Sequence, residues 1–200
     1  LSSYRPLTLL NTTNYFVIKN RLKMKIAVFC SANNSVVDEF AKEVDDFGAW
    51  IGREGHTLVY GGANTGLMER LANSAHEAGA MVIGVVPQIL EKGGRASEFI
   101  DVEIPCDNLS DRKDLMLAQS DAAVVLPGGI GTLDELFTVA ASRTIGYHQK
   151  PLVVYNIRGF WDSLRALLDD LQQRGMIRGK YTDCIKFVGS LDELAAAIAD

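Results

Sequence analysis

The chain has 200 residues, of which 48% are hydrophobic and 22% charged, as in globular proteins that bury one substantial core. Acidic residues outnumber basic ones by 25 to 20, so the net charge of −5 gives no electrostatic reason to expect nucleic acid as a partner. No apolar run approaches the roughly 20 residues that a membrane-spanning helix needs, which argues against a membrane protein.

Residues 1–23 differ from the rest of the chain. They are rich in Ser, Thr and Asn, contain no acidic residue and show no sustained hydrophobic period. We expect a flexible N-terminal extension here, with an organelle-targeting peptide as the alternative, and Met24 could be the natural start. Residues 24–200 are expected to form a single domain, because no linker, repeat or low-complexity tract divides them.

From residue 25 onward, short apolar runs alternate with longer segments of helical period, which predicts repeated βαβ units. Most of the runs are continuous, which indicates a parallel sheet buried on both faces by helices. Strands are expected at Lys25–Cys30, Thr57–Tyr60, Met81–Val86, Phe99–Ile104, Ala122–Leu126, Pro151–Tyr155 and Cys184–Val188. Helices are expected at Val36–Glu54, Gly66–Ala78, Leu109–Gln119, Thr132–Ile145, Phe160–Arg174 and Leu191–Ala199. In such an α/β fold, ligands bind in the loops beyond the carboxyl ends of the strands.

The most informative of these loops is Pro127-Gly128-Gly129-Ile130-Gly131-Thr132. Its glycines let the backbone turn with N–H groups pointing inward, and the free amides at a helix start favour a phosphate. The loop lacks the Gly-Lys-Ser/Thr of a P-loop and is not Gly-x-Gly-x-x-Gly, so neither triphosphate nor dinucleotide redox chemistry is indicated. A phosphate cradle is therefore predicted, and a tight turn without a ligand is the alternative.

A second glycine loop, Gly61-Gly62-Ala63-Asn64-Thr65-Gly66-Leu67-Met68, follows the strand that ends at Tyr60. Gly61 and Gly62 are expected to form the floor of this loop, where the backbone approaches another group closely. For Gly66 we favour close packing of the next helix against the sheet.

A third loop leads into a helix that contains Asp111-Arg112-Lys113-Asp114, with Ser110 as the expected N-cap. Two cations in a first turn oppose the helix dipole, which indicates a bound anion. A solvated charge cluster is the alternative, because Asp111 and Asp114 belong to the same run.

Glu135 has two interpretations. Thr132 and Glu135 have the spacing of a capping box, in which Glu135 only returns a hydrogen bond to the helix start. The same placement would hold a carboxylate beside any phosphate or ribose on the amides of Gly129 to Thr132. Asp134, about 100° further round the helix, is expected to point elsewhere.

Three motifs occur together: Pro-Gly-Gly-x-Gly-Thr-x-x-Glu at 127–135, Arg-Lys at 112–113 followed by Met116, and Gly-Gly-x-x-x-Gly-Leu-Met at 61–68. In this combination the chain resembles the Lonely Guy family, cytokinin-activating enzymes that release a free base from a nucleoside 5′-monophosphate. The resemblance runs from about Lys25 to the C-terminus and includes His148-x-Lys150-Pro151 and Gly159-Phe160-Trp161-Asp162. Members were formerly labelled lysine decarboxylases, but nothing here indicates a pyridoxal-phosphate lysine.

The resemblance implies a Rossmann-like nucleotide-binding domain in which Arg112 and Glu135 are catalytic. It implies hydrolysis of the N-glycosidic bond of a purine (cytokinin-type) riboside 5′-monophosphate to free base and ribose 5-phosphate, without a cofactor or metal, and a homodimer as the assembly. The residues expected to bind the nucleotide are Lys113, Gly128, Gly129, Ile130, Gly131, Thr132, Gly61, Gly62 and Met116.

The chain departs from the family pattern at the base end of the pocket. The loop Cys30-Ser31-Ala32-Asn33-Asn34 lacks the usual Gly-Ser-Ser, and Ala141-Ser142 replaces Thr-Trp. Gly94 stands where members carry a substrate-contacting glutamate, with Glu91 as a candidate substitute. The preferred base is therefore left open.

A non-catalytic carrier of a nucleotide or phosphorylated cofactor is the alternative function, because a fold alone does not fix activity. Retention of both Arg112 and Glu135 favours the enzyme, since a carrier needs only the cradle. A structural module with vestigial loops is disfavoured, because three loops keep ligand-type residues at the same edge of the sheet.

The chain has three cysteines, Cys30, Cys106 and Cys184. Their odd number argues against a closed set of disulfides, and their wide spacing fits no metal site. Both observations favour a reducing, cytoplasmic setting.

Overall fold

A computed structural model describes residues 23–88 and 93–199 of the chain. The predicted N-terminal extension lies outside these residues except for Lys23, and so does Glu91. No helix in the described ranges is long and apolar enough to cross a membrane.

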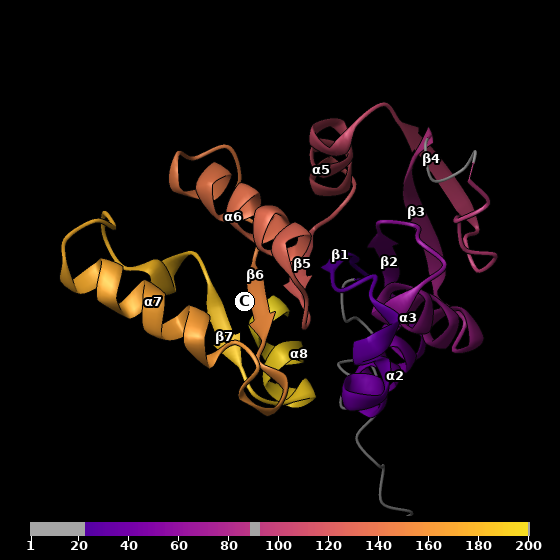
Figure 1. Cartoon of the computed structure of the whole chain (residues 1–200), viewed down its shortest axis with the longest axis horizontal. Helices are drawn as coiled ribbons and strands as arrows, with labels where there is room; N and C mark the ends of the chain where they lie inside the picture. The colour runs from indigo at the N-terminus through magenta and orange to yellow at the C-terminus, as the bar shows by residue number, and fades with distance from the viewer. Residues whose placement is uncertain (1–22, 89–92, 200) are drawn as a thin grey trace, which may run out of the picture.

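The described strands form one parallel sheet in the order β4-β3-β2-β1-β5-β6-β7, as Figure 1 shows. The central strand β1 pairs with β2 through Ile26 and Leu58 and with β5 through Ile26 and Ala122. The prediction of a parallel α/β sheet is therefore confirmed. The strands are β1 (Lys25–Phe29), β2 (Thr57–Tyr60), β3 (Met81–Pro87), β4 (Val102–Cys106), β5 (Ala122–Val125), β6 (Leu152–Tyr155) and β7 (Lys186–Val188).

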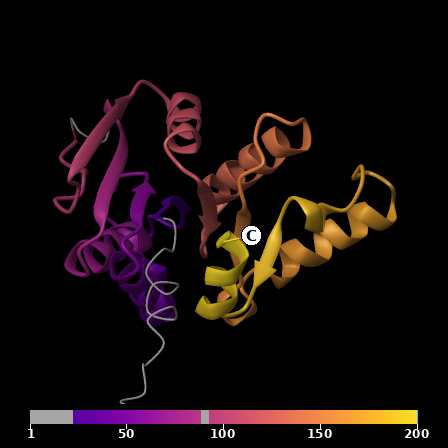
Figure 2. The ribbon, with the colours of Figure 1, turned by 180° about the vertical axis from the view of Figure 1, so that it is seen from behind.

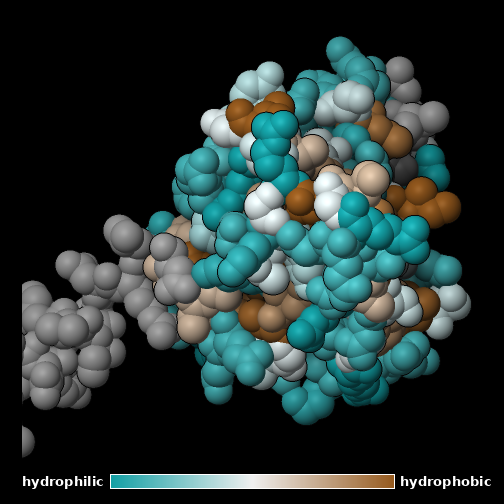
Figure 3. Space-filling model, turned by 90° about the vertical axis from the view of Figure 1, so that its left-hand side faces the viewer, coloured by the Kyte–Doolittle hydropathy of each residue, from teal (hydrophilic) through white to brown (hydrophobic). Residues whose placement is uncertain are grey.

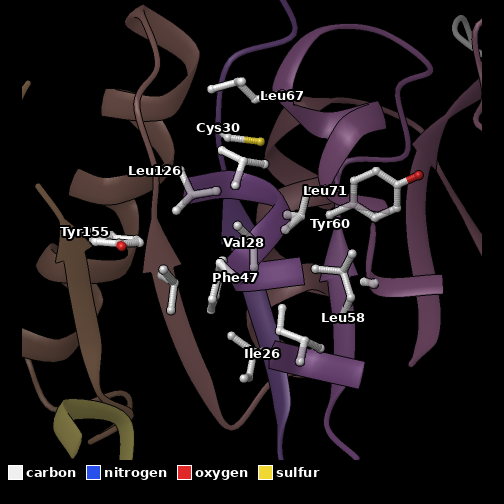
Figure 4. Packing of buried hydrophobic residues seen from close by; sticks show 14 of the residues in the cluster. Ile26, Val28, Cys30, Phe47, Leu58, Tyr60, Leu67, Leu71, Leu126 and Tyr155 are labelled. Atoms are coloured by element: carbon white, nitrogen blue, oxygen red, sulfur yellow. The ribbon is translucent and has the colours of Figure 1, made fainter. Parts of the chain in front are cut away.

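Helices cover both faces of the sheet, as Figures 1 and 2 show from opposite sides. One face is covered by α2 (Val37–Arg53), α3 (Gly66–Glu77) and α8 (Leu191–Ala199). These helices pack against alternate strand residues such as Val28 and Tyr60, and Figure 4 shows part of this hydrophobic cluster. The residues between them, such as Phe29, face α5 (Leu109–Ala118), α6 (Ile130–Thr144) and α7 (Asp162–Gln173). Burial on both faces explains why the strands are apolar without alternation.

The chain changes direction between β1 and β5. It first builds β1 to β4 outward on one side, then returns to place β5 on the other side of β1. The loops after β1 and β5 consequently lead to helices on opposite faces, α2 and α6. A crevice at such a switch point is the usual ligand site of an open parallel sheet.

Three predicted boundaries were wrong in an informative way. Phe99 and Ile100, expected to begin β4, pack against the core from an irregular segment, and Cys184 and Ile185 do the same before β7. Burial of apolar side chains does not require strand geometry, so hydrophobicity alone overextended both strands. Helix α6 begins at Ile130, two residues before its predicted start.

Candidate active site

The start of α6 forms an open cradle of backbone amides. Gly129 occupies the N-cap position, and no side chain caps the helix. The first N–H groups of an α-helix have no partner within the helix, and here Gly129, Ile130 and Gly131 are exposed, Ile130 to 88%. A Cβ added at Gly129 or Gly131 would meet no atom of the chain within 4 Å. The protein itself therefore leaves open the space in which a ligand would approach these amides.

Gly128 has a different role in the same loop. An ideal Cβ at Gly128 would lie 2.1 Å from Oγ1 of Thr132, which is only 3% exposed. The absence of a side chain at Gly128 thus lets Thr132 fold back beneath the loop.

Glu135 does not cap α6, so the capping-box interpretation is wrong. It lies in the second turn of the helix, and its side chain faces Arg112 of α5, with 3.7 Å between Oε1 and Nη2. The capping-box alternative does not hold because the helix has Gly129 at its N-cap and starts two residues before Thr132.

Arg112 and Glu135 form a buried pair of opposite charges. The two residues are 9% and 7% exposed. Burial raises the pKa of Glu135 to about 7, and the nearby charge of Arg112 opposes this rise. Both Nε and Nη2 of Arg112 are buried without a hydrogen-bond partner among the described residues. Because buried donors are rarely left unpaired, the guanidinium is suited to donate hydrogen bonds to oxygen atoms of a ligand.

Gly61 makes room for this arginine. A Cβ at Gly61 would lie 1.4 Å from Nη2 of Arg112, so no other residue fits without displacing the guanidinium. Gly62 has φ of +75°, a left-handed conformation that favours glycine. Both glycines are buried beneath the site, consistent with a loop floor.

Gly66 also packs closely, but against a different partner from the one expected. A Cβ at Gly66 would lie 2.4 Å from the carbonyl carbon of Ala32, and its N–H donates to Oδ1 of Asn34 at 2.8 Å. It therefore packs against the loop after β1 and not against the sheet.

Lys113, expected to bind the nucleotide, forms an ion pair with Asp134. Its Nζ lies 2.8 Å and 2.7 Å from the two carboxylate oxygens. Asp134 was expected to point elsewhere, and the sequence did not indicate that α5 packs beside α6. The two helices thus carry adjacent ion pairs, one buried and one at the rim.

The structure also locates the N-cap of α5 and the side chain of Met116. Asn108, not Ser110, is the N-cap, and its Oδ1 accepts hydrogen bonds from the N–H groups of Ser110 and Asp111. Arg112 is therefore the fourth residue of the helix. Met116 is fully buried in the core, so its side chain packs below the site.

A cavity of about 180 Å³ lies on the other side of the glycine loop. The sequence did not predict it, because its walls come from three segments that are far apart in the chain. It is lined by Ser31, Asn33, Val36, Phe40, Pro127, Gly128, Gly129 and Phe160.

Taken together, these features define an α/β protein with an open cradle of backbone amides and a buried arginine–carboxylate pair at the switch point of its sheet. The family model described as "Possible lysine decarboxylase" matches residues 68–198. A cytokinin riboside 5′-monophosphate phosphoribohydrolase of Mycobacterium tuberculosis is 36% identical over 87% of this chain and 92% of its own. An Arabidopsis thaliana protein of the same name is 32% identical over 81% of this chain and 71% of its own. The chain belongs to this family, the Lonely Guy family.

Solved structures show the same fold. The molybdenum cofactor carrier protein of Chlamydomonas reinhardtii superposes with a TM-score of 0.68, covering 88% of this chain and 96% of that one. Its sequence identity is 21%, so the likeness extends to the fold alone.

Proposed function

We propose that this protein hydrolyses the N-glycosidic bond of a purine riboside 5′-monophosphate of the cytokinin type, releasing the free base and ribose 5-phosphate. The observation that carries the proposal is the Arg112–Glu135 pair, buried beside an uncapped helix start. The relatives that bear the name phosphoribohydrolase support it.

The cradle would hold the 5′-phosphate. The amides of Gly129 to Thr132 and the positive end of the α6 dipole favour a dianion at this position. With the phosphate fixed there, the ribose would reach Glu135 one turn deeper, and the unpaired N–H groups of Arg112 would hold its oxygen atoms. Gly61 and Gly62 would form the floor beneath the sugar.

Glu135 would supply the chemistry. Cleavage of an N-glycosidic bond places positive charge on the ribose, as in glycoside hydrolysis. A desolvated carboxylate stabilises that charge strongly and also accepts a proton from the attacking water. General acid–base assistance of this kind contributes roughly 10²- to 10⁴-fold. A pKa of about 7 keeps a large fraction of Glu135 ionised at neutral pH.

The test is to incubate the protein with AMP and with an N6-substituted AMP and to quantify free base and ribose 5-phosphate. The enzyme proposal expects equal amounts of both products, with Arg112→Ala and Glu135→Gln releasing little of either. A protein that binds AMP but cleaves neither nucleotide would instead be a carrier, because the amide cradle alone is enough for binding.

We also infer that a second copy of the chain covers the outer face of α6. Ile130 and Phe137, seven residues apart on this helix, are 88% and 40% exposed, and Ile145 just beyond it is 69% exposed. Figure 3 shows separate hydrophobic patches on a mostly hydrophilic surface, seen from the side on which α7 lies. Association through α6 would place the partner beside the cradle.

For location we propose the cytoplasm. All three cysteines are free thiols, and Cys30 and Cys106 are buried where they form no disulfide. Such unpaired cysteines are typical of a reducing compartment. Cell fractionation with an antibody against the protein tests this placement.

A further inference from the structure

The cavity beside the glycine loop has an aromatic wall that the proposed reaction does not use. Phe160 is 41% exposed at the cavity, and its ring packs edge-on against Phe40 of α2 with 5.4 Å between the centroids. Val36 completes the apolar side, while Ser31 and Gly129 form the side toward the cradle. We name this cavity the Phe160 pocket.

The chain holds Phe160 in place by an unusual local conformation. Arg158 has φ of +52°, and it is the one non-glycine residue with positive φ in the described ranges. Gly159 follows with φ of +76°. Arg158 is also tied to α2, since its Nε lies 3.0 Å from Oε1 of Glu43. Strained backbone of this kind persists where the surrounding structure fixes it and is frequent at ligand sites.

Asn156 makes a second set of contacts, two hydrogen bonds that fix the turn on the C-terminal side of Phe160. Oδ1 of Asn156 accepts a hydrogen bond from the N–H of Trp161 at 2.6 Å, and its Nδ2 donates to Asp162 at 2.7 Å. The motif Gly159-Phe160-Trp161-Asp162 therefore presents one aromatic ring at a defined position on the pocket.

The order of the strands places this pocket relative to the proposed reaction centre. Arg112 lies over Gly61, which follows β2, whereas Phe160 follows β6 and Gly129 follows β5. In the sheet, β2 and β6 lie on opposite sides of the β1–β5 pair. Along the carboxyl edge, the cradle therefore separates the Arg112–Glu135 pair from the Phe160 pocket.

A nucleotide laid along this edge leaves the pocket for something other than its base. With the ribose at Arg112 and Glu135 and the phosphate on the cradle, the base would lie on the far side of the sugar from Phe160. Ser31 and Asn33, which were expected at the base end of the pocket, would then lie on the phosphate side instead. Only a group attached to the outer side of the phosphate extends into the pocket. A volume of about 180 Å³ is smaller than the roughly 300 to 1,000 Å³ of drug-sized sites, so it admits one ring.

We propose that the Phe160 pocket is a second subsite, which binds a ring joined through the phosphate of the nucleotide. Its ligands are nucleoside 5′-phosphates whose phosphate carries a ring-bearing ester or anhydride. The inference rests on the proposed function for the position of the phosphate.

Two esters of AMP test the subsite, the phenyl ester and the methyl ester. Both carry one negative charge on the phosphate, so a difference in their affinity reports the ring alone. Titration calorimetry of the wild-type protein is expected to give a Kd about tenfold lower for the phenyl ester, the size expected of one buried aromatic contact. Phe160→Ala removes this preference and leaves the Kd of AMP within about twofold.

Control variants separate the wall from general damage. Leu167→Ala removes an apolar side chain that is 51% exposed on α7 and leaves the preference intact. Phe160→Leu keeps an apolar wall without the ring and is expected to give an intermediate preference for the phenyl ester. This variant also provides the test if Phe160→Ala does not fold.

Equal affinity of the two esters for the wild-type protein, or a preference that survives Phe160→Ala, would overturn the subsite while leaving the proposed function standing. Failure of the wild-type protein to bind AMP would overturn the proposed function, and the subsite with it, because the phosphate would then lack its placement.

Discussion

Lys113 and Asp134 join α5 to α6 directly beside the buried Arg112–Glu135 pair, with both carboxylate oxygens of Asp134 within 2.8 Å of Nζ. Of the residues of α5, only Arg112 and Met116 are buried. The rim ion pair adds a polar contact between α5 and α6, and its two charges act on the pKa of Glu135 in opposite directions.

Asp134→Asn and Lys113→Met are expected to shift the pH dependence of the reaction in opposite directions. The charge of Asp134 raises the pKa of Glu135, whereas Lys113 and Arg112 lower it. If the carboxylate is the active form, kcat/KM rises with pH through the pKa of Glu135. Asp134→Asn then moves this rise to lower pH and Lys113→Met to higher pH, as pH–rate profiles will show. Shifts of the same sign would contradict the assignment.

Glu135→Gln is expected to lower kcat by roughly 10²- to 10⁴-fold while AMP still binds. The amide has nearly the same shape but neither stabilises positive charge nor accepts a proton. Product release and AMP titration measure the two effects separately. Glu39→Gln, the same change at an exposed position of α2, serves as the control and leaves kcat unchanged. A Glu135→Gln protein as fast as wild type would refute the mechanism.

The same substitution reports on stability. Because the pKa of Glu135 is about 7 in the folded protein and 4.5 when unperturbed, the folded state binds more protons between these values. By linkage, the contribution of Glu135 to the free energy of unfolding is full below pH 4.5 and is lost as pH rises to about 7. Denaturant unfolding at several pH values is expected to show Glu135→Gln gaining roughly 2 to 3 kcal/mol relative to wild type across this window. A pH-independent difference between the two proteins would show that Glu135 is not buried as described.

Gly61→Ala is expected to cost about as much activity as Arg112→Ala, because the added methyl group occupies the position of the guanidinium. At Gly189 a Cβ would meet its nearest neighbour, Glu193, at 3.8 Å, which is ordinary contact, so Gly189→Ala is the matched control. Circular dichroism will establish that both variants fold. Full activity in folded Gly61→Ala would mean that Arg112 does not act from this position.

Light scattering at micromolar concentration is expected to give a mass near twice that of one chain. Ile130→Asp and Phe137→Asp place charges on the face assigned to the second copy and are expected to shift the mass toward 21.8 kDa. A wild-type mass at that single-chain value would contradict the dimer.

The elements that were predicted well are those whose signal is local. Glycine after a strand, continuous apolar runs and helical period located the sheet and placed Arg112 and Glu135 at one edge of it. The features that the sequence did not reveal depend on contacts between distant segments. Examples are the Lys113–Asp134 ion pair, whose residues are 21 positions apart, and the Arg158–Glu43 ion pair, whose residues are 115 positions apart. The capping-box error had a different cause, since the spacing from Thr132 to Glu135 fits a cap whether or not the helix starts there.

The strand order also bears on when the site comes into being during folding. The segment from β1 to β4 contains only neighbouring strand pairs along the chain, whereas β1 must wait for β5, whose Ala122 pairs with Ile26, 96 positions away in the sequence. Pairings so distant in sequence form slowly, because closing a long loop costs entropy before any contact repays it. Gly61 belongs to the early half, Glu135 to the late half and Arg112 to the segment that joins them. A chain in which the two halves have not docked therefore holds no opposed charges over Gly61, and recovery of nucleotide binding during refolding reports the pairing of β1 with β5.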